Sequence, residues 1–579
     1  MRASFIFRIR IVALLVGLLG LLLVVRLYNI QIAHGSDYRD RAEGQYAALS
    51  AGAFDRGRIY FTPKEGPPIA AATIESGYTV ALIPNQLTDP AATYAALSTF
   101  IALDRKEFME KSSKRDDPHE ELAHRVSPEV GQAIRNADIE GVGVYPEAWR
   151  LYPGAKTAAQ TIGFLGYGTG DILTGQYGLE RFYDEVLVKP DSGLYVNFFA
   201  DIFAGIRTQL LAVGTGSGGD VVTAIEPSVQ TFFENLLGRY NAEWRPEEVG
   251  AILMDPKTGA LIAISTLPSF DPNNLREADS AAFSNRLVER VYEFGSIMKP
   301  LTLAAGIDAG VITPESTYND RGYAVYDGSR INNWDLKGRG NGTSMQRVLS
   351  DSLNTGAAWV AVDKLGTDLF RSYFESYGLR EETGIDLPNE AEPLTANLDS
   401  PRSIEYATAS FGQGVAVSPI AMARALATLA NHGLVPSPHV ALELRYPGFP
   451  PKKLDWAPER RAISEKAAEA VTGMLVRVVD EALRGGTVKI PELSVAAKTG
   501  TAQIAKENER GYYDGRYLHS FFGYFPAYNA KFLVFFYAVA PQGAKYASET
   551  WTAPFMESVR FLVSYYDIPP DRVSTTPSP

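Results

Sequence analysis

Residues 11–32 form the longest apolar run of the chain, and Arg26 is their only charged residue. A helix that crosses a bilayer needs about 20 mostly apolar residues, so this run is predicted to be a transmembrane anchor, with Arg26 reaching the far headgroups. Positive charge before the run predicts that 1–10 is a cytoplasmic tail and that the rest lies outside. A cleaved signal peptide, with a weak small-residue site at 33–35, is the alternative. The charges before the run are Arg2, Arg8 and Arg10.

Beyond the anchor, residues 33–213 mix short strand-like and helical stretches with many turns. This pattern predicts an N-terminal pedestal domain of mixed α/β structure. Residues 214–219 read Gly-Thr-Gly-Ser-Gly-Gly and match the spacing of a dinucleotide-binding loop. That function requires a following helix, whereas 220–225 alternate like a strand, so we predict a turn or hinge instead. Residues 214–248 are therefore expected to hold the hinge and the start of the next domain.

Residues 249–565 carry the pattern of a second, larger domain. Val249–Ile264 predicts two strands joined by a turn. The stretch 531–540 is apolar on both faces, so it is predicted to be a central strand. The simplest fold is an antiparallel sheet flanked by helices, within an α+β chain, and 566–579 is predicted to be a disordered tail. Helices are expected at 297–309, 343–351, 417–432 and 463–484, and further strands at 494–504 and 519–526.

The composition excludes several classes of function. With 579 residues, 46% of them hydrophobic and 21% charged, the chain is long enough for two sizeable globular cores. Its net charge of -12 argues against a nucleic-acid-binding surface, which needs concentrated positive charge. The absence of cysteine excludes disulfides, thiolate metal sites and a cysteine nucleophile.

The first motif with chemistry is Ser296-Ile-Met-Lys299. Pro300 is tolerated only near the first turn of a helix, so the helix is predicted to begin close to Ser296. This places the hydroxyl at the positive end of the helix dipole, with Lys299 on the same helical face. A lysine that acts as a base must be partly neutral, and burial beside another cation, for which Lys498 is the candidate, lowers its pKa.

Two more motifs follow in order, Ser352-Leu-Asn354 and Lys498-Thr-Gly-Thr501. The first is predicted in a loop between helices, after a capping box formed by Thr343 and Gln346. The second lies in a strand where Gly500 allows another backbone to approach, and a substrate peptide can pair with such a strand. Each motif alone also fits a structural role, as a helix cap or an edge strand. The ordered trio is what indicates acyl transfer through a serine ester.

The trio resembles the S-x-x-K, S-x-N and K-T-G set of penicillin-recognising serine acyltransferases. With the anchor and the large N-terminal domain, the chain resembles class B penicillin-binding proteins, which are peptidoglycan D,D-transpeptidases. One departure is Phe294, where the family usually has proline, so altered packing and unchanged chemistry are expected. Other stretches similar to the family are 56–60, 150–153, 178–180, 254–259 and 412–414.

The resemblance implies a role for each motif residue. Ser296 is the expected nucleophile, Lys299 its base, and the backbone N–H groups of Ser296 and Thr501 the oxyanion hole. A relay delivers the proton to the leaving D-alanine, and β-lactams acylate the same serine. No metal or cofactor is implied. The relay would consist of Ser352, Asn354 and Lys498, and the substrate-binding strand of Thr499, Gly500 and Thr501.

The resemblance also implies partners and a location. Stem peptides of peptidoglycan are the expected substrates, and the pedestal is expected to contact a polytopic membrane glycan polymerase and other division or elongation proteins. The protein would be a single-pass inner (cell) membrane protein with its catalytic domain in the periplasm. Arg56, Arg58 and Glu180 are interpreted as structural ion pairs, with a direct partner contact as the alternative, and His519 is interpreted as structural. The alternative functions are a D,D-carboxypeptidase or β-lactam-hydrolysing enzyme, or an inactive penicillin-binding sensor or scaffold.

Overall fold

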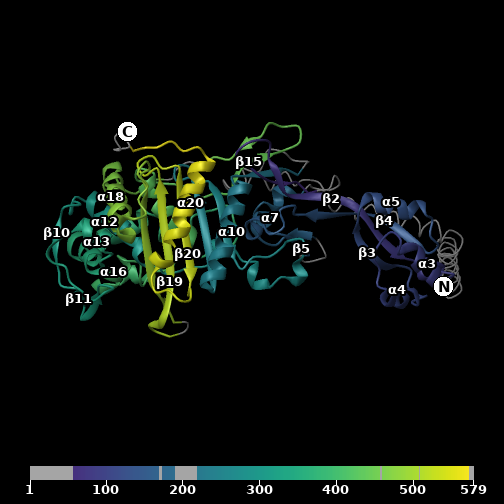
Figure 1. Ribbon diagram of the computed structural model, residues 1–579, viewed down its shortest axis with the longest axis horizontal. Helices are drawn as coiled ribbons and strands as arrows, with labels where there is room; N and C mark the ends of the chain where they lie inside the picture. The colour runs from purple at the N-terminus through teal and green to yellow at the C-terminus, as the bar shows by residue number, and fades with distance from the viewer. Residues whose placement is uncertain (1–55, 168–172, 189–217, 457–459, 507–508, 573–579) are drawn as a thin grey trace, which may run out of the picture. The chain divides into compact units, whose positions relative to one another are not determined.

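The computed structural model divides into two compact units (Figure 1). The small unit comprises Arg56 and Ile74–Leu151 among the described residues, and the large unit comprises Gly57–Thr73 and the residues from Tyr152 onward. The predicted anchor at 11–32 lies outside the described residues, and none of the helices that are described is long and apolar enough to cross a membrane. The described residues are 56–167, 173–188, 218–456, 460–506 and 509–572.

The small unit is a short sheet with helices, as the mixed α/β prediction requires. Strand β2 pairs with both β3 and β4. Each of its three α-helices begins at a side chain that accepts backbone N–H bonds, namely Asp89, Asp104 and Ser127. The elements are the part of β2 (Ile69–Leu82) from Ile74 onward, η2 (Pro84–Gln86), α3 (Pro90–Leu97), α4 (Arg105–Ser112), β3 (Glu120–Val126), α5 (Pro128–Asn136) and β4 (Val142–Leu151). Their core is Val80, Leu82, Leu87, Leu97, Phe108, Val126 and Ile134.

The large unit includes residues that the sequence pattern assigned to the pedestal. Apolar residues between Tyr152 and Leu187 are buried in the main hydrophobic core of the large unit. The predicted boundary at 213 therefore does not coincide with the division of the structure. That boundary followed the glycine-rich change in composition, whereas the division follows which segments of the folded chain lie against one another. The elements are β1 (Ile59–Phe61), α6 (Ala159–Ile162), β5 (Leu165–Tyr167), β6 (Leu173–Gly175), α7 (Gly178–Phe182) and α8 (Asp184–Leu187).

A strand follows the glycine-rich stretch, as predicted. β7 (Asp220–Thr223) runs parallel to β1 and antiparallel to β15 (Ala441–Arg445), which also pairs with β16 (Lys452–Lys453). Helix α10 (Pro227–Trp244) comes next, capped by the carboxylate of Glu226.

A five-stranded sheet in the order β18-β19-β20-β8-β9 forms the centre of the large unit. All four strand pairs are antiparallel, and β8 and β9 form the predicted hairpin. The central strand is β20, as its doubly apolar sequence predicted. Alternate residues from Phe532 to Ala538 pack into one core, and those from Leu533 to Val539 pack into another. The strands are β8 (Glu248–Met254), β9 (Leu261–Leu267), β18 (Ala496–Ala505), β19 (Tyr512–Phe525) and β20 (Phe532–Val539).

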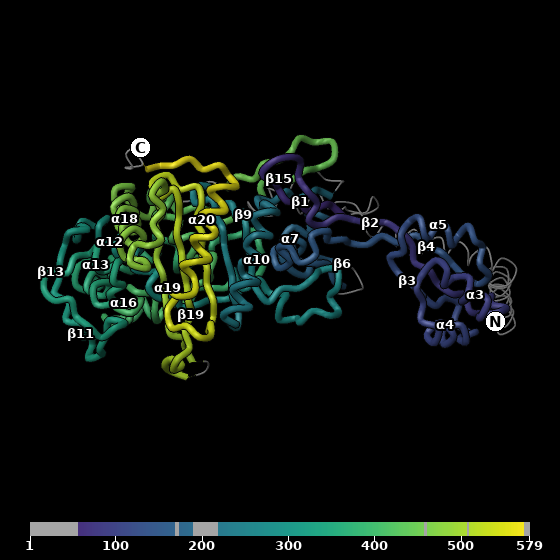
Figure 2. The backbone as a smooth tube through the Cα atoms, in the orientation of Figure 1, coloured from purple at the N-terminus to yellow at the C-terminus, as the bar shows by residue number. Residues whose placement is uncertain are grey.

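Helices cover both faces of this sheet, which gives the predicted α+β arrangement. Helices α10 and α20 pack against one face of the sheet and form a hydrophobic core with it. In this core Trp551 stacks between Tyr240 and Phe536. On the other face α12 packs against α18, and Figure 2 shows these two helices side by side. The helices are α12 (Lys299–Asp308), α17 (Pro419–Ala430), α18 (Glu465–Arg477), α19 (Ala547–Thr550) and α20 (Thr552–Tyr565).

The remaining elements build the helical side of the large unit. Helix α13 is capped by Ser344, whose hydroxyl accepts from Arg347 N, so the predicted capping box at Thr343 is one residue out of place. Thr343 belongs to β13 instead, and its hydroxyl bonds Gly340 O. The helices are η3 (Leu275–Glu277), η4 (Ser280–Ala282), α11 (Arg286–Glu289), η5 (Gly295–Met298), α13 (Met345–Ser350), α14 (Asn354–Ala358), η6 (Trp359–Leu365), α15 (Thr367–Ser376), η7 (Ala396–Asp399), α16 (Ser403–Ala409), η8 (Val478–Ala482) and η9 (Leu483–Gly486). The strands are β10 (Thr317–Asp320), β11 (Tyr323–Tyr326), β12 (Ser329–Asn332), β13 (Gly340–Ser344), β14 (Leu434–Val435) and β17 (Arg460–Arg461).

The start of the predicted tail is ordered. Ile568 is buried in the core beneath the sheet, and the carboxylate of Asp571 accepts hydrogen bonds from the backbone N–H and hydroxyl of Ser494. Arg572 forms an ion pair with Asp480 at 3.0 Å. The polar composition of this segment concealed these specific contacts, and residues 573–579 lie outside the described range.

Candidate active site

Ser296 lies in a tight turn that leads into α12. The turn, Gly295–Met298, is a 3-10 helix, and Pro300 occupies the first turn of α12, as predicted. Gly295 has φ +66°, and a Cβ atom there would lie 2.9 Å from the carbonyl oxygen of Thr501. A Cβ atom on Gly412 would lie 2.4 Å from the carbonyl oxygen of Gly295. The absence of side chains at these two glycines thus allows the turn to pack closely against its neighbours.

Lys299 is completely buried behind Ser296. Its Nζ donates to the Ser296 Oγ at 2.8 Å and to the carbonyl oxygen of Ser352 at 2.7 Å. Burial, and secondarily the charge of Lys498, hold the pKa of Lys299 well below its ordinary value. A neutral amine at this distance has a free electron pair with which to accept the proton of the serine hydroxyl.

Ser352 lies between the two lysines, in the loop that joins α13 to α14. Its Oγ is 3.1 Å from the Nζ of Lys299 and 3.1 Å from the Nζ of Lys498. Its backbone has φ +56°, a conformation that costs a non-glycine residue about 1 kcal/mol. The loop between helices was predicted from the sequence, and the bridging position of the hydroxyl provides a path for a proton between the two amines.

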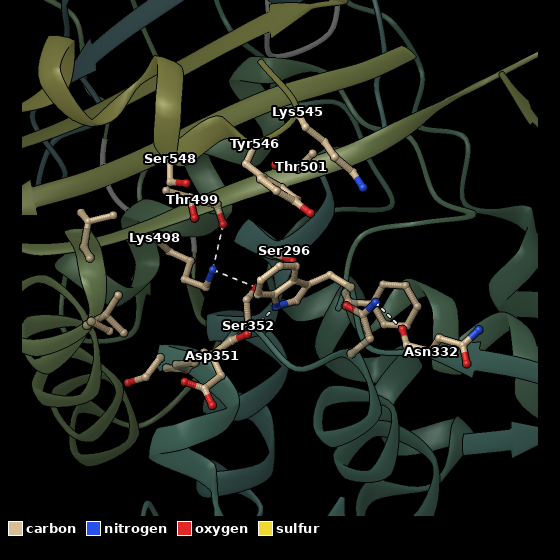
Figure 3. A pocket seen from close by; sticks show the side chains of 18 of the residues that line it. Ser296, Asn332, Asp351, Ser352, Lys498, Thr499, Thr501, Lys545, Tyr546 and Ser548 are labelled. Carbon is tan, nitrogen blue, oxygen red and sulfur yellow. Dashed lines mark hydrogen bonds between the residues drawn. The ribbon is translucent and has the colours of Figure 1, made fainter. Parts of the chain in front are cut away.

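Lys498 extends from β18 toward the same point (Figure 3). Its Nζ also donates to the carbonyl oxygen of Thr499 at 2.9 Å. The side chain is buried, and burial lowers the pKa of Lys498 to about 7. The second amine therefore changes its charge near neutral pH.

A pocket of about 820 Å³ opens over these groups, and Ser296, Ser352 and Lys498 line it. Thr499 and Thr501 line it as well, and Thr501 Oγ1 accepts from Ala547 N at 3.0 Å. The pocket is therefore bounded by β18 on one side and by the helical elements on the other (Figure 3).

Gly500 has a different position from its two threonine neighbours. It is not among the residues that line the pocket. A Cβ atom on Gly500 would lie 2.5 Å from the carbonyl oxygen of Phe294 and 2.3 Å from Ser520 Oγ. The predicted close approach of another backbone is thus present, and it brings the turn of Ser296 against β18.

Asn354 lines the pocket at the start of α14. Its Nδ2 donates to the carbonyl oxygen of Asn332 at 2.9 Å, which holds the amide in place. The structure thus brings the five predicted catalytic residues to one site. The sequence interpretation did not include several other lining residues, because all of them except Asn332, the last residue of β12, lie in loops that have no periodic pattern. Among them are Asn332, Trp334, Arg339, Asp351, Lys545 and Tyr546.

The residues interpreted as structural have buried or paired positions. The ring of His519 contacts Thr550 Oγ1 at 3.0 Å and the carbonyl oxygen of Lys545 at 3.1 Å, and burial lowers its pKa to about 4. Phe294, the departure from the family pattern, is buried and packs edge-on against Phe535 at 5.3 Å. Arg56 and Glu180 are buried, and Arg58 is exposed.

The site has a hydroxyl beside a buried amine whose pKa is held well below its ordinary value, and a second hydroxyl shared with a second amine. This arrangement defines a class, the serine acyltransferases that use lysine as the base. The family model described as the penicillin binding protein transpeptidase domain matches residues 249–559. The chain therefore belongs to the penicillin-binding protein transpeptidase family, which confirms the predicted resemblance to class B penicillin-binding proteins.

Individual relatives agree with this assignment. The chain is 28% identical to Stage V sporulation protein D of Bacillus subtilis (strain 168), over 94% of this chain and 84% of the relative. It is 26% identical to Peptidoglycan D,D-transpeptidase FtsI of Escherichia coli (strain K12), over 78% of this chain and 74% of the relative. Among solved structures, Penicillin Binding Protein 2X from Streptococcus thermophilus has the same fold, with a TM-score of 0.71 at 19% identity over 90% of this chain and 82% of that chain.

Proposed function

We propose that this chain is a peptidoglycan D,D-transpeptidase that cross-links stem peptides through an ester on Ser296. The observation that carries the proposal is the buried Lys299, whose Nζ lies 2.8 Å from the Ser296 Oγ and whose pKa is held well below its ordinary value. A base that is neutral at physiological pH and in contact with the hydroxyl is what acyl transfer at a serine requires.

In the first step, Ser296 Oγ forms a bond to the carbonyl carbon of the penultimate D-alanine of a donor peptide. Lys299 accepts the hydroxyl proton, and the backbone N–H groups of Ser296 and Thr501 stabilise the oxyanion. The C–N bond to the terminal D-alanine then breaks. The leaving amine takes a proton through Ser352, whose Oγ lies 3.1 Å from each lysine Nζ.

The charge of the pocket supports an anionic donor peptide. Thr499 and Thr501 present hydroxyls to the pocket beside Lys498, and they would hold the terminal carboxylate. Asp351 is the acidic residue among those lining the pocket. The other basic lining residues are Arg330, Arg339, Arg484 and Lys545.

In the second step an amine from a neighbouring strand attacks the ester carbonyl. The amine loses a proton to Lys299, the serine oxygen recovers one, and an amide cross-link replaces the ester. If water took the place of the amine, the same site would act as a D,D-carboxypeptidase. A β-lactam undergoes only the first step, and Ser296 then stays acylated.

Labelling by fluorescent penicillin tests the assignment of the nucleophile. The wild-type protein is expected to carry a covalent label after denaturing electrophoresis, and Ser296→Ala is expected to carry none. Ser350→Ala is the matched control, because Ser350 also lines the pocket but contacts neither lysine. Equal labelling of Ser296→Ala and the wild type would overturn the assignment. Rapid spontaneous loss of the label would indicate a hydrolase.

The proposal extends to location and partners. The chain would be anchored by residues 11–32, with a cytoplasmic N-terminus and the large unit outside the membrane. The small unit lacks every residue of the candidate site, so we assign it to docking a polytopic membrane glycan polymerase. Replacing Ile74–Leu151 by a short glycine-serine linker tests this role, since the catalytic residues all lie in the large unit. The variant is expected to retain penicillin labelling and lose co-purification with the polymerase, and retained co-purification would refute the docking role.

A further inference from the structure

Asp320 is a buried carboxylate next to the active site. It ends β10 and is 1% exposed. Its Oδ1 accepts from Thr355 Oγ1 at 2.9 Å, Gly322 N at 2.9 Å and Asn333 Nδ2 at 3.0 Å. Its Oδ2 accepts from Asn333 Nδ2 and from Arg339 N, both at 3.0 Å. Four donor groups from three chain segments thus meet at one acceptor.

This cluster is connected to the active-site residues Ser352 and Asn354. Asn333 Oδ1 accepts from Thr355 N at 3.2 Å, so the amide of Asn333 joins Asp320 to the start of α14. The carbonyl oxygen of Asn332, the residue before it, accepts a hydrogen bond from the Nδ2 of Asn354 at 2.9 Å. The residue after it, Trp334, donates from its indole N–H to the carbonyl oxygen of Asp351, which precedes Ser352. The segment 332–334 therefore holds both ends of the Ser352–Asn354 loop.

We infer that Asp320 is a positioning residue for the Ser352–Asn354 relay. The loop needs external support, because Ser352 has a left-handed backbone conformation and must still hold its Oγ 3.1 Å from two amines. The hydrogen bonds of Asp320 fix segment 332–334, and that segment fixes the loop. A displacement of about 1 Å in such a group slows catalysis by roughly a hundredfold.

The chemistry of the cluster explains why an aspartate stands at this position. An ionised carboxylate only accepts hydrogen bonds, and all four groups around it donate. Arg339 contributes its backbone N–H to the cluster. Its guanidinium is bound elsewhere, to Asp335 at 2.9 Å and to Asp351 at 3.2 Å. An asparagine at 320 would direct its own N–H groups at Arg339 N or Asn333 Nδ2, so donors would face donors at a buried site.

The test measures the second-order rate of acylation by fluorescent penicillin, divided by the number of active sites that can be labelled to completion. A merely structural defect lowers the number of competent sites, whereas a misplaced relay lowers the rate of each site. Asp320→Asn is expected to react about 10- to 100-fold more slowly per site. Asp368→Asn is the charge-matched control and is expected to react at the wild-type rate, since the side chain of Asp368 is 90% exposed and, among the described residues, forms an ion pair with Arg371 alone, at 2.9 Å.

Two variants at Thr355 test the positioning role even if Asp320→Asn does not fold, and a double variant tests it when Asp320→Asn folds. Thr355→Val removes one donor without changing the size of the side chain, and it is expected to slow acylation per site about tenfold. Thr355→Ser keeps the hydroxyl and is expected to recover most of the rate. In the double variant Asp320→Asn with Asn333→Asp, donor and acceptor exchange places, and partial recovery over Asp320→Asn is expected.

The inference rests on the proposed function, and the two fail in different ways. A wild-type protein that takes up no label would overturn the proposed function. A wild-type protein that labels normally, with Asp320→Asn and Thr355→Val within twofold of its rate per site, would overturn the positioning role alone. Equal rates of acylation in Thr355→Val and Thr355→Ser would also overturn the positioning role alone.

Discussion

Ser352 Oγ lies 3.1 Å from the Nζ of Lys299 and 3.1 Å from the Nζ of Lys498, so one hydroxyl joins two buried amines. Two ammonium groups so close together would repel each other in a site that excludes water. Burial lowers the pKa of both lysines, and the charge of Lys498 lowers the pKa of Lys299 further. This relationship determines how the site should respond to pH and to substitution.

Acylation by a penicillin should decline as the pH rises through about 7, the pKa of Lys498. Above this pH Lys498 loses the charge that attracts the carboxylate of the β-lactam. A second, acidic limb should appear where the falling pH protonates Lys299, whose pKa is held well below its ordinary value by burial. Second-order acylation rates between pH 5 and 9 measure this profile. In Lys498→Arg, whose guanidinium stays charged, the alkaline limb should flatten; an unchanged alkaline limb would contradict this role.

The buried amine of Lys498 should cost stability, and the cost should depend on pH. The unfolded chain holds this proton up to about pH 10.5, whereas the folded protein holds it only to about 7. Between these values the unfolded state binds more protons, so stability rises with pH across that window. Below pH 7 the full cost remains, on the order of 5 kcal/mol. Lys498→Met should therefore raise Tm at pH 6 and raise it less at pH 9.5. An equal loss of Tm at both pH values would argue against a stability cost from the buried amine.

Ser352 allows stability and chemistry to be separated. Ser352→Gly should slow acylation at least tenfold, because the bridging hydroxyl is lost, yet it should keep or slightly raise Tm, because glycine adopts φ +56° freely. Ser352→Ala should slow acylation to the same extent without this gain in Tm. Calorimetry and penicillin labelling of the two variants check the prediction. Acylation of Ser352→Gly at the wild-type rate would show that the hydroxyl is dispensable.

Gly500 should tolerate no side chain. In Gly500→Ala the new Cβ would meet the carbonyl oxygen of Phe294 at 2.5 Å, so the turn of Ser296 and β18 must separate. Both acylation and stability should fall, the latter by about 1–3 kcal/mol. Gly238→Ala is the matched control, since nothing lies within 4 Å of its Cβ and it sits inside α10; it should stabilise the protein by up to about 1 kcal/mol. A Gly500→Ala protein as stable and as reactive as the wild type would refute the close-packing argument.

Local patterns predicted much of the large unit. The doubly apolar sequence of β20 placed it at the centre of the sheet, and Pro300 fixed the start of the helix beside Ser296. The spacing of Ser296 and Lys299 follows directly from helix geometry. These features depend on residues that are close together in the chain, which is why a single sequence was sufficient to predict them.

Features that depend on distant residues were not predictable in this way. The apolar residues of 152–187 look no different in sequence from those of the small unit, and their packing in the main core of the large unit is what assigns them to it. Asp571 pairs with Ser494, and Trp334 bonds the carbonyl of Asp351, without any local signal. The same holds for Asp320, whose donors come from positions up to 35 residues away.

The most direct test of the central claim uses uncross-linked glycan strands that carry pentapeptide stems, with the products analysed by mass spectrometry. The wild-type protein is expected to give cross-linked peptide dimers, with one D-alanine released for each cross-link formed, and Ser296→Ala is expected to give neither product. Release of D-alanine without cross-links would show that water is the acceptor and would overturn the assignment as a transpeptidase, and cross-links formed by Ser296→Ala would overturn Ser296 as the nucleophile.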